Sequence, residues 1–241
     1  MAKYDLLIKN GTIVDGQGGE PYKGNVAIIG DKIAAVGQFD GDAKEVIDAK
    51  GKIVTPGFVD IHTHYDGQSI WSERLSPSSS HGVTTVIMGN CGVGFAPCRK
   101  EDQQTLIKVM EGVEDIPDAV MTEGLPWDWE TFPQYLDALE ERKRDIDVGA
   151  FLPHSPLRVY TMGDRGANRE VATPEDLKRM HDIAVEALNA GAMGFATSRL
   201  SFHRMKDGSL IPTYDAARAE LSAVTSAMKE TGKGVVQMVL D

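Results

Sequence analysis

Cysteines and long hydrophobic runs are scarce in this sequence. Only two cysteines, Cys91 and Cys98, occur among 241 residues. In a reducing compartment such thiols are more often free, ligating or catalytic than disulfide-bonded, so a disulfide-stapled fold is the less favoured interpretation. No apolar stretch reaches membrane-spanning length, and the apolar run in the first nine residues is too short and too charged for a signal peptide. The sequence therefore predicts a cytoplasmic protein with no membrane partner.

Basic residues are also few. Acidic residues outnumber basic ones by 36 to 25, which gives a formal net charge of -11 and a pI near 5.0. Because this field repels phosphate backbones and no cluster of lysine and arginine interrupts it, nucleic acid is excluded as an expected partner. The hydrophobic content of 41% is ordinary for a globular protein, and the chain is long enough to bury a sizeable core.

Residues 1–55 consist of short apolar runs separated by turn signals. The runs are YDLLIK, TIVD, VAII, KIAAV and KIV. Asn10-Gly11 lies between the first two and is typical of a two-residue hairpin turn, and Gly30-Asp31 separates two others. This pattern predicts a small antiparallel β-sheet over residues 1–55 that is joined near Pro56 to the rest of the chain.

Residues 56–241 alternate strand-like and helix-like segments, as a parallel α/β sheet requires. A helix is expected from the N-cap Thr173 to Gly191, and a second one from Thr213 to Gly232. These helices would return each strand parallel to the last, so the pattern predicts the first part of a (β/α) TIM-like barrel. Five strands are expected, near Phe58–His64, Thr84–Cys91, Val148–Pro153, Ala192–Thr197 and Gly234–Leu240.

The connection from Gly92 to Ile146 is much longer than the others. It is rich in acidic residues and contains Trp127 and Trp129. Loops of this length in compact domains are usually lids or binding segments. The alternative is a solvated insertion packed by its own tryptophans, and the sequence does not favour one over the other.

His62 and His64 follow an apolar segment in the run GFVDIHTHYD. Residues two apart on a strand face the same side, so both imidazoles would point together. A pair of imidazoles at the carboxyl end of a barrel strand can hold a divalent ion, whereas an isolated His-x-His can simply be exposed or hydrogen-bonded. The buried-looking strand before the pair favours the metal site. Asp66, just after it, is interpreted as a supporting residue or a helix cap.

Cys91 stands between glycines at the end of the apolar strand TTVIMGNCGVG. Glycines there allow the backbone to approach a ligand closely. An isolated cysteine is most simply a small buried hydrophobe, but a position beside the His-x-His strand favours a metal ligand or bridge. Cys98, on the following loop, is interpreted as an ordinary buried thiol.

Five segments together resemble the amidohydrolase superfamily, and specifically its D-aminoacylase (N-acyl-D-amino-acid deacylase) group. The segments are DLLIKNGTIVDG, TPGFVDIHTHYD, HGVTTVIMGNCGVGFAP, HSPLRVYTMGDR and AGAMGF. The resemblance implies a metal-dependent hydrolase barrel with a small β-sandwich partly formed by the N-terminal residues. It also implies that His62, His64 and Cys91 bind one or two ions, usually Zn2+ although other divalent metals remain open. The expected substrate is a small N-acyl amino acid or related amide.

The chain departs from the pattern of that group in several ways. The family has three further barrel strands, later histidine ligands and a late aspartate base, and the expected base therefore lies beyond Asp241. The resemblance matches His154 and Arg158 to a histidine and an arginine after the third strand. We expect these two and Ser198 to contact substrate, with structural roles as the alternative. His81, His181 and His203 are interpreted as having no role in the site.

Two other functions remain open. The first is a related amidohydrolase acting on a cyclic amide or carbamoyl substrate, because such amidohydrolases share the His-x-His strand and differ in their specificity loops. The second is a truncated, non-catalytic metal-binding fragment with little activity of its own. A homo-oligomer or a missing C-terminal half would complete the site.

Overall fold

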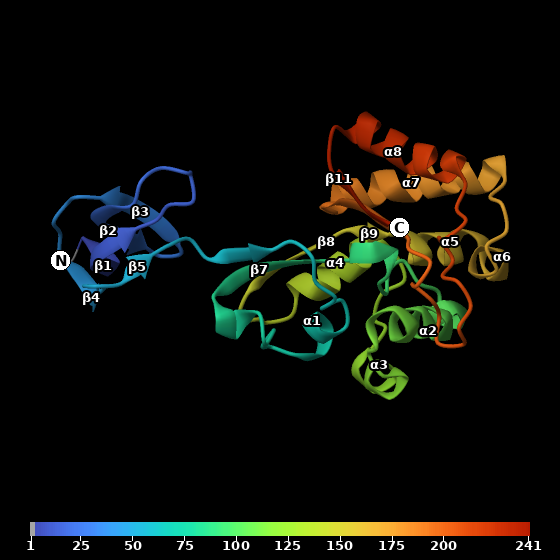
Figure 1. Ribbon diagram of the computed structural model, residues 1–241, viewed down its shortest axis with the longest axis horizontal. Helices are drawn as coiled ribbons and strands as arrows, with labels where there is room; N and C mark the ends of the chain where they lie inside the picture. Colours follow the sequence, from blue (N-terminus) through green and yellow to red (C-terminus); the bar gives the residue numbers. More distant parts are fainter. Residues whose placement is uncertain (1–2) are drawn as a thin grey trace. The chain divides into compact units, whose positions relative to one another are not determined.

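The computed structural model describes residues 3–241 and divides into two compact units, Met1–Gly57 and Phe58–Asp241. Figure 1 shows strands alone in the first unit, and strands with helices in the second. Within residues 3–241, no helix combines the length and apolar character needed to cross a membrane.

The first unit is a five-stranded sheet in the order β3-β2-β1-β4, with β5 also paired to β1. Its strands are β1 (Tyr4–Ile13), β2 (Tyr22–Ile29), β3 (Lys32–Gly37), β4 (Ala43–Asp48) and β5 (Ile53–Val54). The first three are antiparallel, and the turn expected at Gly30-Asp31 is confirmed because Ile29 pairs with Lys32. The prediction of a wholly antiparallel sheet is wrong, since β4 and β5 run parallel to β1.

Asn10-Gly11 is a bulge within β1 and not the hairpin turn that the sequence predicts. The register with β2 shifts between Ile8 and Gly11, and Asn10 has a φ of 64°. A Cβ on Gly11 would lie 2.5 Å from Cγ2 of Val54. The glycine therefore makes room for β5, and the positive φ serves a local kink that leaves the strand continuous.

The second unit contains two three-stranded parallel sheets, in the orders β6-β7-β8 and β11-β10-β9. Phe151 separates β8 from β9, and its N–H donates to Met88 O of β7 at 2.9 Å. One bent segment therefore pairs with β7 through its first half and with β10 through its second. The strands are β6 (Phe58–Asp60), β7 (Val83–Met88), β8 (Asp147–Ala150), β9 (Leu152–Pro153), β10 (Gly194–Arg199) and β11 (Val235–Leu240).

All five strand regions expected from the sequence are found, but β6 is shorter than predicted. It ends at Asp60, so His62 and His64 follow the strand and do not belong to it. One further bond continues the pairing, because Thr63 N–H donates to Ile87 O at 3.0 Å. The two histidines therefore start from a segment that is anchored to β7.

The helices connect and cover these strands. They are α1 (Gln68–Trp71), η1 (Ser79–His81), η2 (Asn90–Gly92), η3 (Lys100–Asp102), α2 (Gln103–Glu114), α3 (Asp118–Gly124), α4 (Phe132–Glu140), α5 (His154–Met162), α6 (Asp164–Ala167), α7 (Pro174–Ala190) and α8 (Arg218–Thr231). The predicted cap of α7 is confirmed: Thr173 and Asp176 form a reciprocal capping box. Helix α8 begins at Arg218, later than expected after Thr213, because residues 212–215 form a turn and residues 216–217 are not helical. Figure 1 shows α7 and α8 side by side.

The long connection is a helical insertion, made of η3, α2, α3 and α4, that packs into the main core. Trp129 is buried and donates its indole N–H to Phe95 O at 2.8 Å. Trp127 lies against both of these residues, with ring centroids 5.7 Å from each. The tryptophans pack the insertion, as the second alternative expected, but the insertion is not solvated, because its buried residues belong to the main core.

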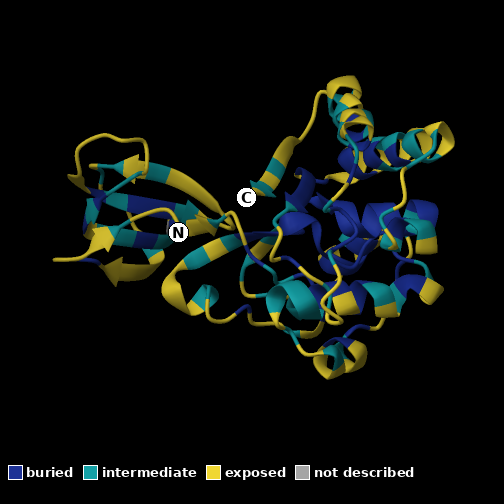
Figure 2. Ribbon diagram, turned by 45° about the vertical axis from the view of Figure 1, so that its right-hand side comes forward, coloured by how far each residue is buried: buried dark blue, intermediate teal, exposed yellow. Residues whose placement is uncertain are grey.

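The core of the second unit lies between its strands and its helices, where Figure 2 shows the buried residues gathered. The two end strands, β6 and β11, are different. Each is paired on one side only, and each exposes large apolar side chains, such as Phe58 and Val59 on β6 and Val235 and Leu240 on β11. These edges carry unpaired backbone groups beside apolar surface.

Candidate metal centre

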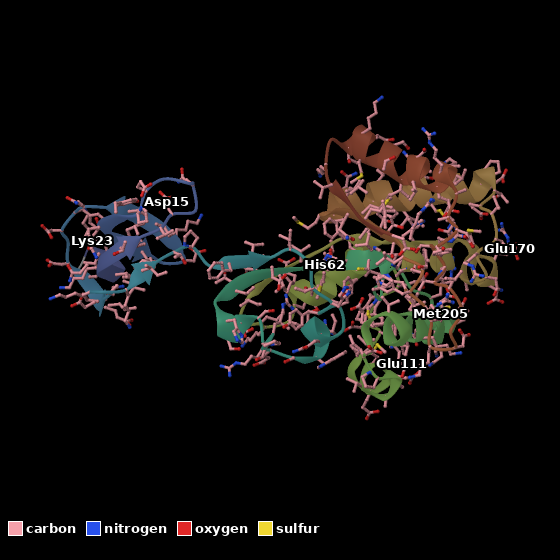
Figure 3. All side chains as sticks on the ribbon, viewed as in Figure 1. Asp15, Lys23, His62, Glu111, Glu170 and Met205 are labelled. Carbon is pink, nitrogen blue, oxygen red and sulfur yellow. The ribbon has the colours of Figure 1, made fainter. Side chains whose placement is uncertain are left out.

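His62 and His64 lie at the carboxyl end of β6, and their rings pack edge to face. Their ring centroids are 5.5 Å apart with planes at 63°. His62, labelled in Figure 3, is exposed, whereas His64 is mostly buried. Thr63, between them, points inward and donates its hydroxyl to Ile87 O at 2.8 Å. This bond holds Thr63 against β7 and leaves both imidazoles together above the strand end.

Cys91 reaches the same place from the end of β7. It sits in the turn η2, with a φ of 54° that is uncommon outside glycine. The flanking glycines explain the turn: a Cβ on Gly89 would lie 2.4 Å from Phe151 O, and one on Gly92 would lie 2.9 Å from Thr197 Cα. The backbone therefore passes too close to the two neighbouring strands for any side chain at these positions.

Two side-chain amides hold this turn in place, that of Asn90 within the turn and that of Gln237 on β11. Asn90 is completely buried, and its amide donates to Ile87 O at 2.9 Å and to Thr63 O at 3.2 Å. Cys91 N–H donates to Oε1 of Gln237, on β11, at 3.0 Å. The strained conformation of Cys91 is thus fixed by contacts from both sides, as is common where strain serves a site.

The three sequence-predicted ligands are brought together. Nε2 of His62 lies 3.3 Å from Sγ of Cys91, and one ligand atom from each of His62, His64 and Cys91 lies within 4.8 Å of the others. It is the one group of three such residues with this spacing among residues 3–241. Two imidazoles and a thiol form a donor set that suits zinc, and three protein donors leave positions open for water or substrate.

Burial sets the protonation of these donors. Burial, together with the nearby His62 and His203, lowers the pKa of His64 to about 4, so this imidazole is neutral near pH 7. Its Nδ1 atom is buried without a hydrogen-bond partner. Burial and the negative charges of Glu114 and Asp66 raise the pKa of Cys91 to about 12. A cation placed among these atoms would reverse the preference of the thiol for its proton.

Two residues near the metal centre were not identified as part of it from the sequence. Glu114, the last residue of α2, has Oε1 3.2 Å from Nε2 of His64, and burial raises its pKa to about 7. His203, for which the sequence suggested no role, is buried, and its Nδ1 lies 2.8 Å from Oγ of Ser198. The acidic composition of the insertion was the only sequence feature that pointed toward Glu114.

His154 and Arg158 lie in a buried network behind the centre. Nε2 of His154 is 3.2 Å from Oε2 of Glu220, and Arg158 pairs with Oε1 of the same carboxylate. Burial lowers the pKa of His154, so its neutral ring donates from Nε2 to Glu220 and accepts at Nδ1 from the Thr197 hydroxyl, 2.9 Å away. Arg158 also donates to Glu170 O at 2.7 Å. All these contacts are internal to the chain.

The other residues singled out by the sequence lie in varied places. Asp66 is buried, and burial raises its pKa to about 8, so it is protonated near neutrality. It does not cap α1, whose N-cap is Gly67. Cys98 is buried, and burial raises the pKa of its thiol. His81 is exposed, and His181 lies between Asp182 and Glu230 on the surface of α7 and α8.

Comparisons with known proteins point to one family. Residues 45–241 match the amidohydrolase family. A D-aminoacylase from Alcaligenes xylosoxydans xylosoxydans is 34% identical over 195 residues, which are 80% of this chain and 37% of that protein. The chain thus spans about two fifths of the length of this curated relative.

Two solved structures are similar over nearly the whole chain. A D-aminoacylase, described as defining a novel subset of amidohydrolases, aligns with a TM-score of 0.76 and 31% identity over 97% of this chain and 44% of that one. An N-acyl-D-glutamate deacylase from Bordetella bronchiseptica, in complex with zinc and a phosphonate inhibitor, aligns with a TM-score of 0.73 and 28% identity. This second match covers 98% of this chain and 45% of that one.

Proposed function

The chain belongs to the amidohydrolase family, and from this premise we propose that it contributes the first metal ligands of an enzyme that hydrolyses the amide bond of N-acyl-D-amino acids. The observation that carries the proposal is the convergence of His62, His64 and Cys91 within 4.8 Å. Similarity to a D-aminoacylase and to an N-acyl-D-glutamate deacylase supports this substrate class. The matches also confirm the resemblance to the D-aminoacylase group.

We further propose that residues 56–241 are the first part of a (β/α) barrel and residues 1–55 part of a β-sandwich. The barrel is supported by parallel strands that follow one another in chain order and by ligands at their carboxyl ends. The division of contacts at Gly57 supports a separate N-terminal module. The cytoplasmic location and the homo-oligomer expected from the sequence are kept as proposals.

Zinc is the ion that we assign to the centre. The neutral His64 ring, with its unpartnered Nδ1, and the thiol of Cys91 are the donors that fit it. When bound, such an ion lowers the pKa of a coordinated water and polarises a carbonyl group. The role of the chain is to hold the donors: Thr63 and Asn90 fix the two segments, and Gln237 holds the Cys91 backbone.

The residues expected to contact substrate receive two different proposals. His154 and Arg158 are buried and both pair with Glu220, so we assign them to supporting the strand ends. Packing agrees, because a Cβ on Gly92 would lie 3.4 Å from Cβ of His154. Ser198, the last residue but one of β10, is also buried, and its hydroxyl lies beside Nδ1 of His203. We keep the expectation that Ser198 contacts substrate and add His203 to it.

The test is to purify the chain, measure bound zinc, and assay release of free amino acid from several N-acyl-D-amino acids. A cyclic amide serves as the competing substrate class. The matched control is the double variant His62→Ala, His64→Ala, which should lose the metal. Zinc bound equally well by that variant would refute the centre, and hydrolysis of the cyclic amide alone would refute the substrate class.

A further inference from the structure

Gln237 connects the edge strand β11 to the turn that presents Cys91. The Cys91 N–H donates to Oε1 of Gln237 at 3.0 Å. Gln237 lies opposite Ala196 in the parallel pairing of β11 with β10, so both side chains project from the same face. On that face Ala196 belongs to a buried cluster with Phe151 and with Ile87 of β7. The side chain of Gln237 therefore reaches across from the last strand to the end of β7, where Cys91 lies.

The conformation of Cys91 needs support from outside the turn. Cys91 and Gly92 both have a positive φ, of 54° and 69°. This conformation is disfavoured for a residue with a Cβ, and a neighbouring glycine leaves the backbone more freedom to depart from it. Among residues 3–241, the bond to Gln237 is the one hydrogen bond that the Cys91 amide N–H donates. The contact with β11 therefore restrains the peptide group about whose nitrogen this φ is set.

The same contact defines how the Gln237 side chain is oriented. A backbone N–H can only donate, so the atom of the Gln237 amide that faces it is the oxygen. A carboxylate on a side chain of the same length also offers an oxygen there, whereas a methyl group offers no acceptor. The variant Gln237→Glu therefore keeps the hydrogen bond to Cys91, and Gln237→Ala removes it.

We propose that Gln237 is a positioning residue that holds Cys91 with its thiol toward the ion, so that zinc binding and the pairing of β11 are coupled. The proposal rests on the function proposed above. In the observed conformation, Sγ of Cys91 lies 3.3 Å from Nε2 of His62. Rotation of Cys91 to a negative φ would turn its Cα–Cβ bond, and with it the thiol, away from this place. Because coupling between two equilibria is reciprocal, zinc should stabilise the pairing of β11 to the same extent that β11 favours zinc binding.

A purely structural anchor for β11 is the competing role for Gln237. Strand β11 is paired on one side only and leaves Val235 and Leu240 exposed, so an anchor would help to keep it in the sheet. An anchor of this kind would change the stability of β11 alone. A positioning residue would also change the affinity of the centre for zinc and the bond between the metal and the Cys91 sulfur.

The first experiment measures the zinc affinity of the full chain by competition with a chromophoric chelator. Gln237→Ala should weaken binding about 10- to 100-fold, the usual effect of removing a residue that orients a metal ligand. It should also diminish the sulfur-to-metal charge-transfer absorption of the chain loaded with Co2+. Gln237→Glu should restore most of both signals, because it keeps the acceptor. Met238→Ala is the matched control, since Met238 is an exposed neighbour on β11, and it should behave as the unmodified chain does. Circular dichroism checks that every variant is folded.

The second experiment follows amide hydrogen exchange by NMR, with and without zinc. Zinc should slow exchange along Val235–Leu240 in the unmodified chain and have little effect there in Gln237→Ala. In the metal-free chain, the Cys91 amide should exchange faster in Gln237→Ala than in the unmodified protein.

Three results would overturn the proposal. One is equal zinc affinity and equal cobalt absorption in Gln237→Ala and the unmodified chain, even if β11 exchanged faster, because Gln237 would then be an anchor only. Another is the same effect of zinc on β11 exchange in both proteins. The third is a Gln237→Glu variant as impaired as Gln237→Ala. If the unmodified chain bound no zinc, the proposed function would fail, while exchange of the Cys91 amide would still decide whether Gln237 holds that backbone.

Discussion

Replacing Glu220 by glutamine should destabilise the second unit by about 3–5 kcal/mol, the cost typical of removing one partner from a buried ion pair. Glu220 on α8 is completely buried, and its two carboxylate oxygens contact Arg158 and His154. Glutamine keeps the shape but leaves the guanidinium of Arg158 without a countercharge. Because Arg158 is itself 1% exposed, water cannot take the place of the carboxylate.

The effect should also depend on pH in a defined direction. Burial opposes ionisation of Glu220, but the hydrogen bond of His154 and the charge of Arg158 overcome it and hold the pKa of Glu220 below its usual range. A carboxyl whose folded-state pKa is depressed stabilises the fold above its unfolded pKa, about 4.3. That stability is lost as the pH falls through the folded-state pKa. The difference between the two proteins should therefore shrink in acid.

Urea unfolding followed by tryptophan fluorescence is the suitable assay, because all three tryptophans, Trp71, Trp127 and Trp129, belong to the second unit. The matched control is Asp182→Asn on α7, which makes the same chemical change in an exposed ion pair with Lys178. This control should leave the transition almost unchanged. If Glu220→Gln and Asp182→Asn shifted the midpoint equally, the reasoning about the buried network would be refuted.

Three further predictions concern single features. Thr173→Ala should cost about 1 kcal/mol in urea unfolding, because it removes the side-chain half of the capping box, and an unchanged midpoint would contradict this. Gly89→Ala should destabilise far more than Gly163→Ala: both have positive φ, but only at Gly89 does the added Cβ meet backbone. Cys91→Ser should weaken zinc binding strongly and Cys98→Ala should not, as a chelator competition would measure; equal losses would argue against Cys91 as a ligand.

The sequence predicted the strands of the second unit well because their signals are local. Apolar runs with glycine or proline at one border marked each strand, and the Thr173-Pro174 start marked α7 correctly. The errors came from contacts between segments. Asn10-Gly11 has the composition of a hairpin turn, but it is a bulge because β5 must pass beside it. Local composition cannot report which distant strand will approach.

The same distinction separates the parts of the site that the sequence revealed from those it did not. His62 and His64 share one short segment, and Cys91 stands in a glycine turn of its own, so each motif could be recognised alone. Glu114 lies at the end of a helix in an insertion whose residues show no motif, and its contact with His64 arises only when α2 packs into place.

His154 and Arg158 illustrate the opposite case, in which residue type suggests substrate contact and the surroundings support the structural alternative. The resemblance suggested substrate contacts for this histidine and arginine, yet a single buried carboxylate on α8 pairs with both. The pattern around α8 shows an apolar stripe and gives no reason to place Glu220 inside. A buried acid is costly unless it is paired, so its position is itself informative. It ties α8 to the start of α5, where His154 packs against Gly92 of the turn that presents Cys91, so the buried pair lies beside one of the proposed ligands.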